Sequence, residues 1–295
     1  MNPGGSGSVR TPLRLRIDLA YDGAPFAGFA RQPDQLTVQG TLEGALSRCL
    51  GQPVLTTCAG RTDRGVHALA QVVHLDVDPS PPVAQRSLAD LLAGAQDSVE
   101  LRFRLDQLVG PAITVWRVRR VGADFDARFS ATGRGYRYRL ADAAAIAPLA
   151  RFDRWHVDGP LALPPMRAAA RALLGEHDFA SFCRRAPGRS SVRRLDEVAV
   201  TRPAAGEVHV RLAGAAFCHQ QVRSIVGCLV EVGRGRWEPD RLAGVLAARD
   251  RSVAARVAPP EGLTLERVVY GRRWPAAPPA PPVAHGRRRA GPSRR

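Results

Sequence analysis

Residues 58–78 read CAGRTDRGVHALAQVVHLDVD and join a polar, glycine-flanked loop to an alternating segment. Asp63 lies in the loop between Arg61 and Arg64, and two cations at this spacing favour the ionised carboxylate. An ionised carboxylate can act as a nucleophile or as a general base. The same spacing also fits an Asx-type turn closed by its own side chain, with both arginines solvated, and such turns are common. On spacing alone, the turn is the more frequent arrangement and catalysis the alternative.

Outward from this loop, strand and helix patterns alternate along the chain. Apolar residues alternate with polar ones, or cluster in short runs, and predict strands near residues 13–19, 73–77, 113–118, 136–140, 198–200, 208–212 and 263–270. Apolar residues at helical spacing predict helices near residues 42–50, 87–93, 166–174, 217–232 and 240–248. This order predicts an α+β fold of two similar lobes, with an antiparallel or mixed sheet flanked by helices.

The two ends differ in composition from the part between them. Residues 271–295 are rich in Pro, Ala and Arg, contain seven Arg and no acidic residue, and show no apolar period. Such a segment cannot bury enough surface to offset its ordering entropy. We therefore expect four segments: a disordered leader (1–11), an N-terminal α+β lobe with the Asp63 loop (12–116), a C-terminal α+β lobe (117–270) and a disordered Pro/Arg-rich tail (271–295).

The charge of the chain indicates its kind of partner. The 295 residues include 43 basic side chains, all of them Arg, against 27 acidic ones, which gives a net charge of +16. A GC-rich genome explains the lack of Lys but not the excess of positive charge. Because the planar guanidinium can bind two phosphate oxygens at once, the composition favours a nucleic-acid partner.

The composition also excludes several classes of protein. No apolar stretch approaches the length of a transmembrane helix, and the Gly/Ser-rich start lacks the apolar region of a secretion signal, so we expect a cytoplasmic protein. The five Cys form no C-x-x-C pair, which predicts free thiols rather than disulfides or a zinc ribbon. The seven His form no metal-binding spacing, and we expect no metal.

Beyond these general features, residues 58–78 resemble the defining motif of the tRNA pseudouridine synthase A (TruA) family. Further segments resemble that family in the same order: YDGAPFAGFARQ (21–32), TVQGTLEGAL (37–46), FDARFSATGRGYRYRL (125–140), LLGEHDFASFC (173–183), AFCHQQVRSIVGCLVEVG (216–233) and AARDRSVAARVAPPEGLTL (247–265). The resemblance extends over residues 13–270. It implies the pseudouridine synthase fold and an isomerase without a cofactor, which detaches, rotates and rejoins uracil at positions 38, 39 and 40 of the tRNA anticodon stem-loop. It also implies a homodimer.

The resemblance assigns roles to four residues. Asp63 falls on the family's nucleophile, and whether it attacks the sugar or the base stays open. Tyr136 matches the tyrosine that stacks on the target uracil, although its pattern alone would place it in the core. Arg223 matches the arginine that pairs with the catalytic carboxylate, and a charge on such an apolar helix needs a partner. Arg61 matches the arginine that helps to displace the base.

Three further residues of the motif have supporting roles. We expect Thr62 to hold the loop by hydrogen bonding, Arg64 to add positive charge beside Asp63, and His67 to be structural rather than a general base. Two other functions stay open: a non-catalytic RNA-binding protein, and a paralogue retargeted to another RNA. Neither makes pseudouridine at positions 38–40 of tRNA.

Overall fold

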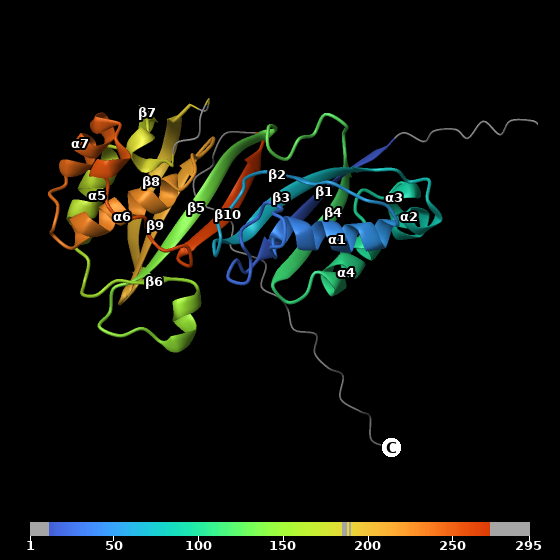
Figure 1. Ribbon diagram of the computed structural model, residues 1–295, viewed down its shortest axis with the longest axis horizontal. Helices are drawn as coiled ribbons and strands as arrows, with labels where there is room; N and C mark the ends of the chain where they lie inside the picture. The colour runs from blue at the N-terminus through green and yellow to red at the C-terminus, as the bar shows by residue number, and fades with distance from the viewer. Residues whose placement is uncertain (1–11, 185–187, 189, 272–295) are drawn as a thin grey trace, which may run out of the picture.

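The computed structural model describes residues 12–184, 188 and 190–271 (Figure 1). The leader expected at residues 1–11, and residues 272–295 of the expected tail, lie outside the described residues. Within the described part, the chain forms one ten-stranded sheet with helices gathered in two groups. The α+β fold with a mixed sheet flanked by helices is therefore confirmed.

The strands and helices of the described residues have the following bounds. The strands are β1 (Leu13–Tyr21), β2 (Thr57–Cys58), β3 (His67–Val77), β4 (Ile113–Val121), β5 (Ala131–Ala141), β6 (Trp155–His156), β7 (Gly175–Asp178), β8 (Val192–Ala204), β9 (Glu207–Gly214) and β10 (Leu263–Tyr270). The α-helices are α1 (Val38–Leu50), α2 (Pro82–Ser87), α3 (Ala89–Leu92), α4 (Val99–Leu108), α5 (Leu163–Arg171), α6 (Gln221–Gly233) and α7 (Arg241–Ala248). Short 3₁₀ helices cover Pro148–Phe152, Ala180–Phe182 and Arg251–Val253.

The sheet joins the two halves of the chain through its last strand. The main strand order is β4-β1-β3-β10-β5-β9-β8-β7, with β2 beside β3 and β6 beside β5. β10 pairs in parallel with β3, where Thr264 is opposite His67, and antiparallel with β5, where Leu265 is opposite Tyr136. The start of β3, directly after the Asp63 loop, is thereby held two strands away from Tyr136.

The helices cover the two ends of this sheet. Helices α1 to α4 gather beside β1, β3 and β4, and helices α5 to α7 gather beside β8 and β9 (Figure 1). The core follows the alternation seen in the sequence: Leu15, Ile17 and Leu19 of β1 are fully buried. Local signals set the ends of α1, because the Thr37 side chain accepts a hydrogen bond from the Gly40 amide and Gly51 adopts a left-handed φ of 67°.

Several element limits differ from those expected. The boundary expected between residues 116 and 117 falls inside β4, which pairs with β1. Helix α6 begins at Gln221 rather than near 217, because Gln220 has a φ of 64° and breaks the helical path. Helix α4 was not expected. Its two fully buried residues, Leu101 and Leu105, leave too weak a periodic signal.

Candidate active site

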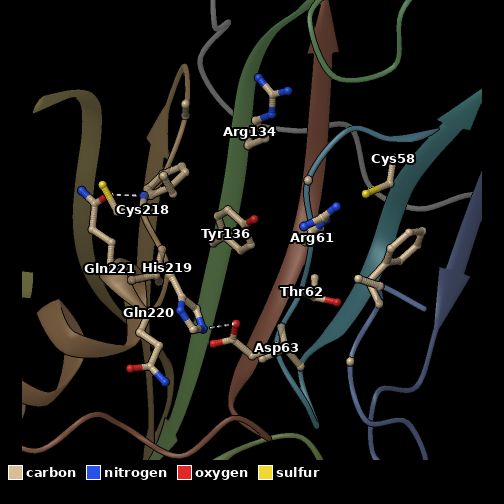
Figure 2. Close-up of a pocket in the computed structure, with 18 of the residues that line it drawn as sticks. Cys58, Arg61, Thr62, Asp63, Arg134, Tyr136, Cys218, His219, Gln220 and Gln221 are labelled. Carbon is tan, nitrogen blue, oxygen red and sulfur yellow. Dashed lines mark hydrogen bonds and ion pairs between the residues drawn. The ribbon is translucent and has the colours of Figure 1, made fainter. Parts of the chain in front are cut away.

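A cleft of about 1800 Å³ contains the loop predicted from the sequence and is lined by both halves of the chain. Figure 2 shows Tyr136 on β5 between two walls: Asp63 and Arg61 come from one side, and Cys218 and His219 come from the other. We call these the Asp63 wall (residues 58–66) and the α6 wall (residues 216–223). The two walls are about 150 residues apart in sequence, and the continuous sheet brings them together through β10.

Asp63 links the two walls by its side chain. Arg223 Nη1 donates a hydrogen bond to Asp63 Oδ2 at 3.0 Å. Figure 2 shows the contact between His219 and Asp63, whose Nε2 and Oδ1 atoms lie 3.2 Å apart. The carboxylate keeps 25% of its surface exposed toward the cleft. Both oxygens therefore face nitrogen atoms while the group stays open to a substrate, which suits a fixed anionic nucleophile.

The backbone of the Asp63 loop is held by hydrogen bonds to neighbouring elements. The Phe29 amide donates to the Thr62 carbonyl at 3.0 Å, and the Thr62 and Tyr21 hydroxyls lie 2.8 Å apart. Gln71 Nε2 donates to the Gly60 carbonyl at 2.7 Å. Thr62 therefore contacts β1 through its side chain and the β1–α1 connection through its carbonyl.

One glycine allows this loop to pack as closely as it does. Gly28 has a φ of 115°, and a Cβ at this position would lie 3.1 Å from the Thr62 carbonyl oxygen and 3.3 Å from the Arg64 nitrogen. A side chain here would be strained and would push against the backbone on both sides of Asp63. Because residue 28 packs this closely on the loop, it fixes the position of the backbone from which the Asp63 side chain extends.

Arg223 reaches Asp63 from the first turn of α6, and a second hydrogen bond aims its guanidinium. Its Nε donates to the Ala258 carbonyl at 2.8 Å, while its own backbone carbonyl accepts from the Ala258 amide at 3.1 Å. Gly227 lets that segment pack against the helix, since a Cβ there would lie 2.0 Å from the Arg256 carbonyl oxygen. The sequence prediction paired Arg223 with Asp63, and the structure brings the two together.

Tyr136 forms part of the cleft lining between the two walls. Only 9% of it is exposed, and its ring packs edge-on against Phe217 with ring centroids 5.0 Å apart. Burial raises the pKa of the Tyr136 phenol, Arg134 opposes the shift, and Asp63 adds to it. The phenol therefore stays protonated at neutral pH, and its ring is an uncharged aromatic part of the cleft lining.

The other predicted residues lie at greater distance from the carboxylate contacts. Arg61 lines the cleft with an exposed side chain, while Arg64 Nη2 donates to Gln35 Oε1 at 3.2 Å at the cleft margin. His67 Nδ1 lies 3.1 Å from both the Gly23 amide and Asp22 Oδ1. His67 thus contacts the turn after β1, which agrees with a structural role.

Two residues of the site were missed by the sequence reasoning. His219 is half-exposed and outside any periodic pattern, so its only signal was its place just before α6. Arg134 lies two residues before Tyr136, on the same face of β5, and that alternation could have indicated it. Arg134 is only 8% exposed, and this burial lowers the pKa of its guanidinium.

Arg134 ties the cleft segments together through backbone carbonyls. Nη2 donates to Ala59 at 2.8 Å on the Asp63 wall, and Nη1 donates to Ala131 at 3.0 Å and to Ala215 at 2.7 Å. Ala215 directly precedes the α6 wall. A buried cation that is bonded to carbonyls leaves its positive charge in the cleft lining, where it favours an anionic substrate.

Comparison with known proteins gives the family. A family model described as tRNA pseudouridine synthase matches residues 169–271. A tRNA pseudouridine synthase A of Frankia casuarinae is 46% identical over 92% of this chain and 92% of its own length. One of Leifsonia xyli subsp. xyli is 43% identical over 87% of this chain and 91% of its own. This chain belongs to the tRNA pseudouridine synthase A family.

Comparison with solved structures gives only a distant similarity. A solved chain of the archaeal box H/ACA sRNP Nop10-Cbf5 complex matches 86% of this chain and 48% of its own, at 12% identity and a TM-score of 0.33. Within the described residues, no three His, Cys, Asp or Glu side chains gather as a metal site. No helix of the described part has the length and apolar character needed to cross a bilayer.

Proposed function

We propose that this chain isomerises uridine to pseudouridine at positions 38, 39 and 40 of the tRNA anticodon stem-loop, with Asp63 as the nucleophile. The observation that carries the proposal is the solvent-open carboxylate held by Arg223 and His219 within an arginine-lined cleft. Its family supports the same activity, because relatives over 40% identical carry the name tRNA pseudouridine synthase A.

The chemistry fits the residues that are present. Pseudouridine formation breaks the bond between ribose C1′ and uracil N1, forms a bond between C1′ and uracil C5, and moves the C5 proton to nitrogen, so reactant and product have the same atoms. No external electron or group is consumed, and no cofactor is required. A carboxylate oriented at both oxygens can form the transient covalent bond, and its placement serves attack on the sugar or on the base.

The remaining residues serve to hold the nucleotide. Removing a uridine from its stack costs a few kcal/mol, and an aromatic surface can offset part of that cost. Tyr136 provides this surface for the uracil, and the exposed Arg61 fills the space that the base leaves. Thr62 and His67 keep the loop in place, and Arg64 adds positive charge at the margin.

The direct test is to incubate an unmodified tRNA transcript with the protein and to map pseudouridine by carbodiimide labelling and primer extension. Asp63→Asn should lower the rate on the order of 10⁴-fold or more, because the amide is not a nucleophile. Binding of tRNA should be nearly unchanged. Asp158→Asn removes an exposed carboxylate outside the cleft and should leave the rate unchanged.

The same experiment separates the alternatives. A non-catalytic RNA-binding protein would bind tRNA with a strong salt dependence and produce no pseudouridine in the wild type. A retargeted paralogue would leave positions 38–40 unmodified and act on another RNA from the same cells. Normal activity of Asp63→Asn would refute the assignment of the nucleophile even if the product were pseudouridine.

We also propose that the protein is a cytoplasmic homodimer, as its family resemblance implies. Sedimentation equilibrium should then give about twice the 31.8 kDa of one chain. A single-chain mass at micromolar concentration would contradict the dimer without affecting the assignment of Asp63. Fractionation of cells should recover the protein with the cytosol.

A further inference from the structure

The connection between β4 and β5, residues 122–130, arches over one end of the sheet and contributes to the cleft (Figure 1). Its tip is a closed turn. Asp126 Oδ1 accepts hydrogen bonds from the amides of Arg128 at 2.7 Å and Phe129 at 2.8 Å, and the Asp126 amide donates to Ser130 Oγ at 2.9 Å. The position of Phe129 is therefore fixed by its backbone.

Further contacts fix this turn to the sheet. Ala127 is fully buried; its amide donates to His74 Nδ1 at 2.9 Å, and its carbonyl accepts from the Tyr270 hydroxyl at 2.7 Å. Arg134, two residues before Tyr136, donates to the Arg128 carbonyl. The turn is thus bonded to β3, β5 and β10, the strands that hold the centre of the site.

The two phenylalanines of this connection have opposite environments. Phe125 packs against Tyr270, with ring centroids 5.1 Å apart, and against His74. Phe129 is 79% exposed, and the Arg128 guanidinium carbon lies 5.2 Å from its ring centroid. An exposed aromatic ring contributes little to folding, so packing within the described residues does not explain why a turn this well fixed carries Phe129.

The surroundings of Phe129 indicate what it contacts. Phe129 lines the same cleft as Asp63 and Tyr136. Among the described lining residues, seven are Arg and two are Asp, so the cleft attracts a polyanion. An apolar ring in such a cleft does not suit a phosphate, whereas it suits the face of a base. Bases of single-stranded RNA segments are recognised by stacking on aromatic rings and guanidinium planes.

We propose that Phe129, with Arg128 against its ring, is a stacking site for an unpaired base of the RNA substrate, separate from the uracil that reaches Tyr136. The inference rests on the proposed function only in taking RNA as the substrate. The base is one of the loop of a stem-loop, because paired bases stack on each other and do not offer a face. The site acts in binding and not in the chemical step.

The test uses a 17-nucleotide anticodon stem-loop RNA that carries 2-aminopurine at one loop position at a time. In the wild type, one position should change fluorescence on binding, and Phe129→Ala should abolish that change. Affinity should fall roughly 5- to 100-fold, the range for loss of one stacked base. Phe129→Trp should restore both signals. Phe152→Ala removes a ring that is 64% exposed and outside the cleft, and should behave as wild type.

Turnover distinguishes this site from the catalytic one. With the unlabelled stem-loop, Phe129→Ala should raise KM by the same factor while kcat stays within about twofold. Equal binding and fluorescence for Phe129→Ala and Phe152→Ala would overturn the proposal, as would a loss of kcat alone or a lowered Tm of Phe129→Ala. Absence of pseudouridine in the wild type would refute the proposed function, and the fluorescence arm would still decide on Phe129.

Discussion

The two walls of the cleft are built in different ways. On the Asp63 wall, hydrogen bonds to the backbone set the position of the loop: neutral ones from Phe29 to Thr62 and from Gln71 to Gly60, and a charged one from Arg134 to Ala59. On the α6 wall, the contacts that reach across are made by ionisable side chains, Arg223 and His219. One wall thus places the carboxylate, and the other one orients it.

This difference allows the loss of stability and the loss of rate, which often occur together in one variant, to be measured separately. Weakening the Asp63 wall moves the backbone that carries Asp63, the proposed nucleophile, so stability and rate should fall together. Weakening the α6 wall leaves that backbone in place and removes only the donor, so rate should fall more than stability. Each of the following experiments tests one side of this distinction.

The largest effect in this comparison is expected for Arg223→Met. Removing the guanidinium leaves Asp63 Oδ2 without its donor, and we expect kcat to fall about 100-fold, less than for a fully buried pair because Asp63 is 25% exposed. Arg223→Lys keeps the charge but cannot bond both Asp63 and the Ala258 carbonyl, so its rate should be intermediate. Steady-state pseudouridine formation measures both.

A second arginine gives the matched control. Arg202 donates to both oxygens of Asp142, whose side chain is 1% exposed, at 2.8 and 2.6 Å, and neither residue lines the cleft. Arg202→Met should lower Tm more than Arg223→Met while leaving kcat within about twofold. A loss of rate in Arg202→Met as large as that in Arg223→Met would remove the distinction between the walls.

A smaller effect is expected on the Asp63 wall from Thr62→Val. The change keeps the shape but removes the hydroxyl bonded to Tyr21, at about 1 kcal/mol of stability and a fall in Tm of about 2–4 °C. Because the loop then holds Asp63 less firmly, kcat should fall about tenfold. Thr41→Val removes a comparable hydroxyl bond to the Thr37 carbonyl away from the cleft, and should lower Tm without changing kcat.

The smallest effect concerns a thiol pair on the α6 side. Cys183 donates a hydrogen bond to Cys218, which lowers the pKa of Cys218; burial opposes this shift and Arg193 adds to it. Since the thiolate is the reactive form, iodoacetamide should alkylate Cys218 at neutral pH faster than Cys58 and Cys228, whose pKa burial raises to about 11. Peptide mass spectrometry measures the rates.

Removal of the donor tests the cause of that reactivity. Cys183→Ala should raise the pKa of Cys218 and move its alkylation to higher pH, and bound tRNA should slow alkylation because both thiols line the cleft. Unchanged alkylation of Cys218 in Cys183→Ala would exclude the hydrogen bond as the cause. Cys183→Ala should not alter kcat by more than about twofold, since neither Cys183 nor Cys218 contacts Asp63.

Most of the fold could be predicted from the sequence because the signals for its strands and helices are local. Strand β1 follows from strict alternation at Leu15, Ile17 and Leu19, and the end of α1 follows from Gly51. Short elements such as β2 and β6 could not be predicted, because two residues carry no period and their pairing comes from distant partners. The family resemblance indicated Asp63, Tyr136 and Arg223 through three separate segments of the chain.

The site residues that the sequence did not predict are brought to the cleft by the fold, and their contacts follow from no local sequence pattern. His219 reaches Asp63 only because Gln220 turns the chain with a φ of 64° before α6 begins. Arg134 acts through carbonyls of Ala59 and Ala215, which belong to different segments and have no side-chain signature. Backbone partners of this kind are invisible in a sequence until the fold places them.

The position of β10 in the centre of the sheet sets the order of events during synthesis. A ribosome releases β1 to β9 first, yet β3 and β5 have no shared neighbour until residues 263–270 emerge. Pro260 and Leu263 of the cleft arrive with the same segment. The nascent chain therefore cannot join the two walls of the cleft through one sheet before β10 leaves the exit tunnel.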